Sequence, residues 1–317
     1  MLLFPFLNNT DGIDYRKTIP IITPDAKPAQ NRIKIKGKGW QNQPVSRTPQ
    51  QQQTIILPIR VKTVYSIVRA TTGSIGGNAD GGAIYGETTA FSLQKIIELM
   101  KVHTNFTAES RFIDIGSGLG KPNLHVAQDP GVKFSFGIEI KRLRWMLSLH
   151  NLRNVLQYRI QQMESDGVNE ANLLGYHCFF SNADIYDATT LDPFTHVYMY
   201  DIGFPPKLME YLSDIFNRSC SAYLICYHPP SLMIDRYYFD IVLICQQNTA
   251  MHGSGENHQG YIYKRATVTN NSSPDIPCDP IFADAWNIVK SGLTTIRDIV
   301  CEKFSTEINS PRPKRHK

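Results

Sequence analysis

A glycine-rich loop that follows an apolar segment is the part of the sequence best suited to bind a ligand. From Phe112 to Gly120 the chain reads FIDIGSGLG, so a short strand, expected over residues 111–115, runs into a tight loop. Glycines lack a Cβ and let the backbone approach a nucleotide-like molecule. Glu139 stands 19 residues beyond Gly120, at the end of the next expected strand, where its carboxylate can accept both ribose hydroxyls. The ligand is therefore expected in the crevice beyond the strand ends.

The residue after the loop distinguishes two classes of cofactor. The dinucleotide pattern GxGxxG needs glycine or alanine at position 121, where this chain has Lys121. S-adenosyl-L-methionine carries no phosphate, and Asp114 before the first glycine suits its amino-acid end. We therefore expect S-adenosyl-L-methionine, bound also by Gly116, Ser117, Gly118 and Gly120. The alternatives are a dinucleotide enzyme and a protein whose glycine turn binds nothing.

A second polar position follows the third expected strand. Asp184 is placed to accept a hydrogen bond from the exocyclic amine of adenine, and Ile185 to cover the ring. The alternative is that Asp184 only caps a helix.

Strands and helices alternate along the middle of the chain, which predicts an α/β fold of the Rossmann-like kind with a mostly parallel, seven-stranded sheet. Strands are expected over residues 111–115, 133–139, 178–181, 196–200, 222–227, 239–245 and 260–264. Helices are expected over residues 89–103, from 122, over 142–163 and over 207–216. Residue 88 or 89 caps the first helix, and Phe91, Ile96, Ile97 and Met100 are its candidate inner positions. No helix separates the last two strands, which predicts an antiparallel hairpin.

Four segments are expected along the chain. Residues 1–62 form a basic arm with Gln and Pro and little apolar periodicity, although residues 55–68 turn apolar and indicate a strand or an arm against the core. Residues 63–110 hold the rest of this arm, a glycine-rich loop and a helix. Residues 111–265 form the catalytic core. Residues 266–317 hold a polar linker, a basic tail and an amphipathic helix expected to pack on its own domain through Phe282, Trp286, Val289, Leu293, Ile296 and Val300.

Charge indicates a polyanionic partner. The net charge is +5, and residues 26–79 contain nine basic residues and no acidic one. Lys34, Lys36, Lys38 and Arg47 are expected to contact DNA phosphates, and the basic C-terminal cluster either adds to this or serves in nuclear import. The alternative is a solvated tail. The six cysteines form no CxxC pair, and the first seven residues are too short an apolar run to span a bilayer, so neither a metal site nor a membrane anchor is expected.

The run IYGET over residues 84–88, followed at this distance by the glycine loop, resembles the Dot-one (disruptor of telomeric silencing) histone H3 lysine methyltransferases. The similarity covers about residues 83–264. It implies a class I methyltransferase fold without a SET domain, S-adenosyl-L-methionine as cofactor, histone H3 in the nucleosome as partner, and a nuclear location. A compact chain of this kind is similar to the short forms in unicellular eukaryotes.

The resemblance also implies roles for individual residues. Tyr85, Glu87 and Thr88 match the loop that closes over the methionine end of the cofactor. Asp114 to Gly120 match the family's first cofactor motif, Glu139 matches its ribose ligand and Asp184 matches its adenine contact. The catalytic side chains implied are Tyr200, Asp201, Phe204 and Tyr261, with Tyr263 as the alternative to Tyr261.

Three features depart from the family's pattern. Asp201 stands where the family usually shows asparagine, and His228-Pro229 lies where it has a Lys-Pro segment. No tryptophan occurs over residues 252–258, where family members carry one close to the channel for the substrate lysine. These departures concern the shape of that channel and hence the number of methyl groups added.

Methyl transfer to lysine requires a neutral amine, whereas an ordinary lysine has a pKa near ~10.4. Aromatic walls formed by Tyr200, Phe204 and Tyr261 are expected to desolvate the ammonium and lower its pKa, unless one of them is ordinary core. Asp201 is expected to hold the ammonium before deprotonation, with a purely structural cap as the alternative. Two other functions stay open: methylation of another amine, such as a nucleic-acid base, and an inactive chromatin-binding relative.

Overall fold

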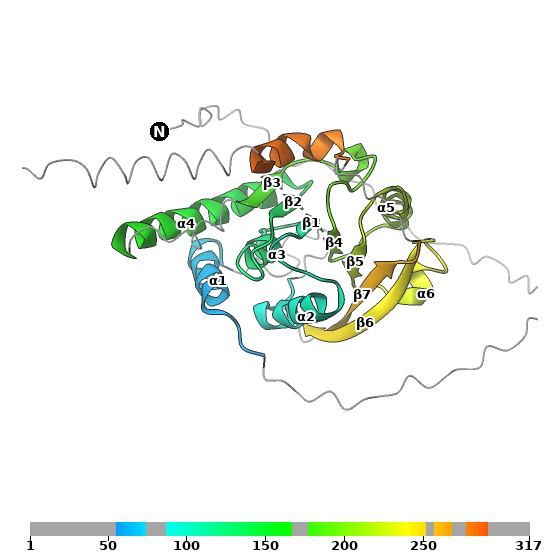
Figure 1. Cartoon of the computed structure of the whole chain (residues 1–317), viewed down its shortest axis with the longest axis horizontal. Helices are drawn as coiled ribbons and strands as arrows, with labels where there is room; N and C mark the ends of the chain where they lie inside the picture. The colour runs from blue at the N-terminus through cyan, green and yellow to red at the C-terminus, as the bar shows by residue number, and fades with distance from the viewer. Residues whose placement is uncertain (1–54, 74–86, 167–176, 252–256, 268–276, 291–317) are drawn as a thin grey trace, which may run out of the picture. The chain divides into compact units, whose positions relative to one another are not determined.

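The computed structural model describes residues 55–73, 87–166, 177–251, 257–267 and 277–290 (Figure 1). The chain divides into two units, Met1–Gln52 and Gln53–Lys317, and every described residue belongs to the second. Several expectations lie outside the described residues. They are the basic arm with Lys34, Lys36, Lys38 and Arg47, most of the glycine-rich loop, Tyr85, the second half of the C-terminal stripe (Leu293, Ile296, Val300) and the basic tail.

A seven-stranded sheet of order β3-β2-β1-β4-β5-β7-β6 forms the centre of this unit. Its strands are β1 (Arg111–Ile115), β2 (Phe134–Ile138), β3 (Cys178–Ser181), β4 (His196–Met199), β5 (Tyr223–Cys226), β6 (Ile241–Ala250) and β7 (Asn257–Arg265). The first five strands pair in parallel, whereas β7 runs antiparallel to both β5 and β6. The predicted parallel sheet with an antiparallel last hairpin is confirmed.

Helices cover both faces of the sheet. They are α1 (Ile59–Thr71), α2 (Ala90–His103), α3 (Lys121–Val126), α4 (Arg142–Asp166), α5 (Pro206–Arg218) and α6 (Pro230–Met233), with a 3-10 turn, η2 (Ile185–Asp187), and a further helix over residues 280–290. Apolar side chains of α5, α6 and the 280–290 helix join one core cluster with alternate strand residues. Apolar side chains of α1, α2, α3 and α4 form two further clusters with other residues of the strands. Figure 1 shows the 280–290 helix in orange at the top and α1 and α2 below the sheet.

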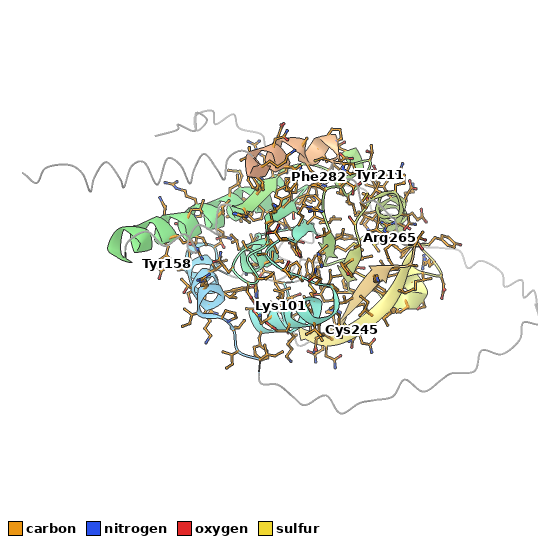
Figure 2. All side chains as sticks on the ribbon, in the orientation of Figure 1. Lys101, Tyr158, Tyr211, Cys245, Arg265 and Phe282 are labelled. Carbon is orange, nitrogen blue, oxygen red and sulfur yellow. The ribbon has the colours of Figure 1, made fainter. Side chains whose placement is uncertain are left out.

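The C-terminal amphipathic helix packs on its own domain, as expected. Phe282 is fully buried, with its ring edge-on to Phe136 at 5.2 Å and to Phe194 at 5.0 Å (Figure 2). Trp286 and Val289 follow on the same face at spacings of four and three residues and are also buried. The helix therefore completes the core beside β1 and β2.

The strand expected as one alternative over residues 55–68 is wrong, because the arm that packs against the core here is a helix, α1. Val61, Val64 and Val68 recur at helical spacing and are buried. The last two pack with Leu124 and Val155 of α3 and α4. β-Branched residues favour strands in isolation, but burial on one helical face outweighs that preference. The boundary expected at residue 62 falls inside α1, so the folded unit begins before it.

The helix after the YGET run begins where it was expected. The side chain of Thr89 caps α2 and accepts a hydrogen bond from Ser92 N, while Thr88 contacts another part of the fold. Ile96, Ile97 and Met100 are buried as predicted. Phe91 is instead 44% exposed, because it lies in the first turn of α2, beyond the edge of the core.

Over the described residues, no helix has the length and apolarity that a bilayer crossing requires. The same residues hold no group of three or more His, Cys, Asp or Glu side chains arranged for a metal ion.

Candidate cofactor site and the strand ends around it

The glycine loop folds back onto the end of the neighbouring strand. Gly116, Gly118 and Gly120 all have positive φ, at 79°, 54° and 77°. The amides of Gly116 and Ser117 both donate to the carbonyl of Ile138, the last residue of β2, at 2.9 and 3.0 Å. Only residues without a Cβ adopt three such conformations in five positions at small cost. The loop thus turns sharply at the carboxyl edge of β1, where the sequence places it.

Two of the glycines make room for aromatic rings of the protein itself. A Cβ on Gly116 would lie 3.4 Å from the Phe204 ring, and one on Gly120 would lie 2.3 Å from the ring of Phe180. Gly120 is therefore required by the packing of β3 against the helix start, and its contact with the cofactor stays a prediction. Phe204 lies at the loop, as its proposed role needs.

Two buried polar atoms beside the loop find no hydrogen-bond partner among the described residues. They are Oδ2 of Asp114 and Oγ of Ser117, whose residues are 2% and 4% exposed. Burial raises the pKa of the Asp114 carboxyl well above its usual range, and the nearby carboxylate of Glu139 raises it further. Leaving such groups unpaired costs about 1–3 kcal/mol each. A ligand that supplies a cationic donor would remove that cost, and this makes the loop a candidate binding site.

Glu139 is buried and holds two backbone amides. Oε2 accepts from Gly118 N at 2.9 Å, and Oε1 accepts from Lys141 N at 2.8 Å. A carboxylate has about four acceptor positions, so both oxygens can still accept a hydroxyl. The residue expected to bind ribose therefore also fixes the shape of the loop.

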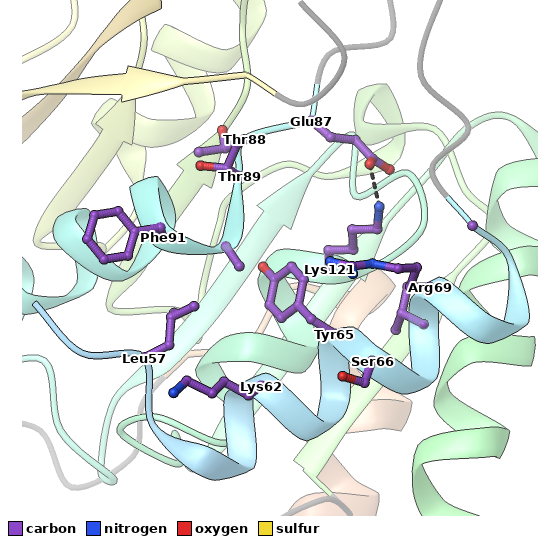
Figure 3. Close-up of a pocket in the computed structure, with 13 residues that line it drawn as sticks. Leu57, Lys62, Tyr65, Ser66, Arg69, Glu87, Thr88, Thr89, Phe91 and Lys121 are labelled. Atoms are coloured by element: carbon purple, nitrogen blue, oxygen red, sulfur yellow. Dashed lines mark hydrogen bonds and ion pairs between the residues drawn. The ribbon is translucent and has the colours of Figure 1, made fainter.

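Glu87 and Thr88, the described part of the YGET run, lie next to α1 and α3. Glu87 forms an ion pair with Lys121, with both side chains largely buried (Figure 3). Thr88 Oγ1 lies 2.9 Å from the hydroxyl of Tyr227, which in turn is 3.0 Å from that of Tyr198. These contacts attach the run to the carboxyl ends of the central strands, as a loop that closes over a ligand requires.

Two cavities share Tyr65, Glu87, Thr88 and Lys121 in their walls. The smaller, about 40 Å³, is bounded by the glycine loop and Asp114, and the larger, about 570 Å³, lies between α1 and the start of α2 (Figure 3). A ligand of cofactor size fills about 300 Å³ or more, so the smaller space alone cannot hold one. The Glu87–Lys121 pair stands in the wall common to both. No pattern in the sequence pointed to Tyr65, which comes from a helix that was not expected.

Asp201 is fully buried at the end of β4, and both carboxylate oxygens are bonded within the protein. Oδ1 accepts from Tyr227 N at 2.7 Å, and Oδ2 lies 2.5 Å from Nδ1 of His228. The hydrogen bond to Asp201 raises the pKa of His228, outweighing the effect of burial. Asp201 has no exposed surface, and the partly exposed side chain of the pair is that of His228; contact between Asp201 and the incoming amine stays a prediction.

Aromatic residues surround that pair unequally. The Tyr200 ring lies 4.8 Å from the Tyr227 ring and lines the smaller cavity. Of the two candidate tyrosines on β7, Tyr263 is fully buried and donates from its hydroxyl to the His228 carbonyl at 2.9 Å, whereas Tyr261 is only partly buried. Tyr263 is therefore a core residue, and Tyr261 is the one still placed to meet a substrate.

Asp184 acts at least as a cap. Its Oδ1 accepts from Tyr186 N at 3.0 Å at the start of η2, and Ile185 is buried in the core beneath the sheet edge. The capping alternative is correct for one carboxylate oxygen, and contact with adenine stays a prediction.

Residues 78–219 match the family model described as "Histone methylation protein DOT1". The predicted resemblance is confirmed over these residues. They include the loop, Glu139, Asp184 and Asp201, and they end at the start of β5. Among curated proteins, none matches this chain.

The chain is similar to several solved structures at low sequence identity. M. capricolum TrmK in complex with S-adenosyl-homocysteine is 9% identical, with 72% of this chain and 91% of that chain covered and a TM-score of 0.38. Synechocystis magnesium protoporphyrin IX methyltransferase with bound SAH is 12% identical, with 64% and 94% covered and a TM-score of 0.36. The Pyrococcus abyssi tRNA (uracil-54, C5)-methyltransferase is 14% identical, with 56% and 40% covered and a TM-score of 0.36.

Proposed function

We propose that this protein is an S-adenosyl-L-methionine-dependent protein-lysine N-methyltransferase that acts on a lysine of histone H3 in the nucleosome. The observation that carries the methyltransferase assignment is the buried, unpartnered oxygen of Asp114 at a glycine loop, within residues that match the DOT1 family model. The class I methyltransferase sheet agrees with it. The histone substrate rests on the family match.

The side chains at the loop fit the cofactor's chemistry. When bound, S-adenosyl-L-methionine supplies an electrophilic methyl group on a sulfonium. Asp114 would accept its ammonium, with the Ser117 hydroxyl as a further partner, and Glu139 would accept the ribose hydroxyls. Lys121 and Glu87 lie at the same wall and carry opposite charges, which suits a zwitterionic end group. The adenine would lie toward Asp184 and Ile185.

The substrate side requires an apolar approach for a lysine side chain. Tyr200 and Phe204 lie beside the loop, and Tyr261 is partly exposed on β7. Aromatic surroundings disfavour the charged ammonium and lower the pKa of the amine, so that a lone pair becomes available for the transfer. Positioning in a fixed geometry supplies much of the remaining acceleration.

Anchoring to the nucleosome is assigned to the basic arm. Lys34, Lys36, Lys38 and Arg47 would contact DNA phosphates without reading sequence, and the protein would work in the nucleus. Each phosphate contact releases counterions, which makes binding steeply dependent on salt.

Labelling with a radioactive methyl group tests this function. Purified protein is incubated with labelled S-adenosyl-L-methionine and, separately, nucleosomes, histone octamers, free DNA and RNA. We expect label on histone H3 of nucleosomes and none with a Gly118→Arg variant, whose side chain would fill the cofactor's space. Label on nucleic acid instead would identify a base methyltransferase, and cofactor binding without transfer would identify an inactive relative.

Deletion of residues 26–54 tests the arm separately, because it stops before α1 begins. We expect weaker nucleosome binding and a flatter log–log salt dependence, by roughly 0.9 per lost phosphate contact. Cofactor affinity, measured by calorimetry, should not change. Equal nucleosome methylation by both proteins at physiological salt would show that the arm only solubilises the chain.

A further inference from the structure

Asp201 and His228 form a hydrogen-bonded pair at the carboxyl ends of adjacent parallel strands. Tyr198 of β4 pairs with Ile225 of β5, so positions 201 and 228, three residues further along each strand direction, meet beyond the sheet. The carboxylate is fully buried, and the imidazole side chain is 19% exposed. The pair thus has a partly exposed histidine at the carboxyl edge of the sheet and a buried acid behind it.

The arrangement sets the tautomer of the histidine. Asp201 Oδ1 is occupied by Tyr227 N, and Oδ2 faces Nδ1 of His228, so Nδ1 carries a hydrogen that it donates to the carboxylate. In the neutral imidazole the lone pair then lies on Nε2. No described residue forms a hydrogen bond with Nε2. A buried carboxylate behind an imidazole is the arrangement that orients histidine bases in other enzymes.

The backbone of the pair is fixed to the cofactor site. The Asp201 carbonyl accepts from Phe204 N at 3.0 Å, closing the turn that brings the Phe204 ring against Gly116. On the other side, the hydroxyl of Tyr263 holds the His228 carbonyl. Asp201, the hydrogen-bond partner of His228, therefore lies in the same short turn as Phe204, whose ring lies against the glycine loop.

Other titratable groups around the imidazole remain neutral near pH 7. From β5 they are Cys226 and Tyr227, and from β7 they are Tyr261 and Tyr263; burial raises the pKa of all four. On the turn after β4 the titratable group is Asp201 itself. His228 is the histidine among these groups, and the hydrogen bond to Asp201 raises its pKa.

We propose that His228, oriented by Asp201, accepts the proton of the substrate ammonium. The inference rests on the proposed amine methyltransferase function. One N–H bond of the ammonium breaks, its electron pair stays on the substrate nitrogen, and the proton forms a bond with Nε2 of His228, from which it exchanges with water. The neutral amine then carries the lone pair that attacks the methyl group.

Both members of the pair are departures from the pattern of the family that the chain resembles. Asparagine is usual at the position of Asp201, and His228 lies in a segment that resembles Lys-Pro. The two departures fall on side chains in direct contact, so they act as one change. An asparagine there would donate from its amide nitrogen to Nδ1 and leave the hydrogen on Nε2, whereas a carboxylate accepts from Nδ1 and stabilises the protonated imidazole.

The experiment compares wild type with His228→Asn in single-turnover methyl transfer across about pH 6 to about pH 9.5. The asparagine amide can donate to Asp201 as Nδ1 does, but it cannot take up a proton. We expect the wild-type rate to rise with pH through the raised pKa of His228. The variant should lose that rise and be slower by at least ~100-fold, a typical contribution of a general base. Its S-adenosyl-L-methionine affinity, measured by calorimetry, should stay within about twofold.

A second variant, Asp201→Asn, keeps the acceptor oxygen for Tyr227 N but turns a donor, its amide nitrogen, toward Nδ1 of His228. Nδ1 must then accept and the hydrogen lies on Nε2, so the imidazole cannot take up the substrate's proton there. We expect this variant to be slowed about as much as His228→Asn and to lose the rise of the rate with pH. An unchanged pH profile and rate in His228→Asn would overturn the inference.

The test uses whichever amine the wild type methylates, which separates the two proposals. Transfer to a non-histone amine with the expected loss in His228→Asn would overturn the histone substrate and support the base. Transfer to histone H3 with a wild-type pH profile in His228→Asn would support the histone substrate and overturn His228 as the base. Cofactor binding without transfer to any amine would overturn both.

Discussion

The carboxyl edge of β1 and that of β4 and β5 lie side by side in the sheet but are built in opposite ways. At β1, Asp114 is buried with an oxygen that no described residue satisfies, whereas at β4 every carboxylate oxygen of the buried Asp201 is bonded. Unsatisfied buried polar groups are rare in proteins and indicate a missing partner. The edge at β1 is therefore a candidate ligand site. At the edge of β4 and β5 the hydrogen bonds of the carboxylate are already made within the protein.

The largest effect on folding should come from changing the glycine that serves packing. Gly120→Ala places a Cβ within 2.3 Å of the Phe180 ring in a residue with φ of 77°. We expect a loss of roughly 2–5 kcal/mol in the free energy of unfolding, from backbone strain of about 1–2 kcal/mol and overpacking of about 1–3 kcal/mol. Denaturant unfolding without cofactor measures it.

Gly203→Ala is the matched control, because Gly203 also has positive φ, 92°, but no atom within 4 Å of the added Cβ. It should lose only the strain of about 1–2 kcal/mol. Adding Phe180→Ala to Gly120→Ala should remove the clash but not the strain. Equal losses in Gly120→Ala and Gly203→Ala would mean that Phe180 moves aside freely.

Asp114→Asn separates the effect of Asp114 on cofactor affinity from its effect on the stability of the protein. In the folded, ligand-free protein the pKa of Asp114 is raised, so its stability falls as pH rises from the unfolded pKa toward the folded one. At neutral pH the amide should therefore make the ligand-free protein more stable. The same change removes a charged acceptor, and S-adenosyl-L-methionine affinity should fall by about 10-fold to 100-fold.

Ser117→Ala is the control for that variant. It removes the other unpartnered buried atom without changing charge, so stability should stay or rise while cofactor affinity falls by less than ~10-fold. Thermal unfolding and calorimetry follow both quantities. A less stable Asp114→Asn would show that the carboxylate has a structural partner, and the contrast between the two edges would disappear.

The smallest effect concerns the pH dependence of stability at the second edge. Hydrogen bonding to Asp201 raises the pKa of His228, so the pair contributes stability that is fully present below the unfolded histidine pKa and lost as pH rises through the folded one. The difference in the free energy of unfolding between wild type and His228→Asn should be larger at about pH 6 than at about pH 9, with wild type the more stable. A pH-independent difference would mean that the raised pKa is absent.

Most strands of the sheet could be predicted from the local pattern of apolar and loop residues. Strands such as residues 111–115 and 178–181 are short apolar runs bounded by loop residues, and both were predicted with their observed bounds. The glycine loop, the cap at Thr89 and the buried face of α2 were also found, since each depends on residues close in sequence. α1 was missed because its three buried valines are a weak signal until α3 and α4 lie against them.

Site residues divide in the same way. The positions of Asp114, Glu139 and Asp201 at strand ends were set by the sequence of each strand and its loop. The partner of Asp201 was not found, although His228 follows the next parallel strand, because the pairing of β4 with β5 and its register are needed to bring them together. The packing role of Gly120 was missed for a related reason: the ring that needs its space, Phe180, is 60 residues away along the chain.

The sequence by itself determined the class of fold, the glycine loop and the acids that follow the strands, because hydrophobic period and turn chemistry are local properties of the chain. Only the tertiary structure decided which polar atoms are satisfied. Whether a buried carboxylate is a ligand acceptor, like Asp114, or the support of an imidazole, like Asp201, depends on donors contributed by distant segments. Those donors are brought within hydrogen-bond distance by strand register and helix packing, which no single stretch of the sequence specifies.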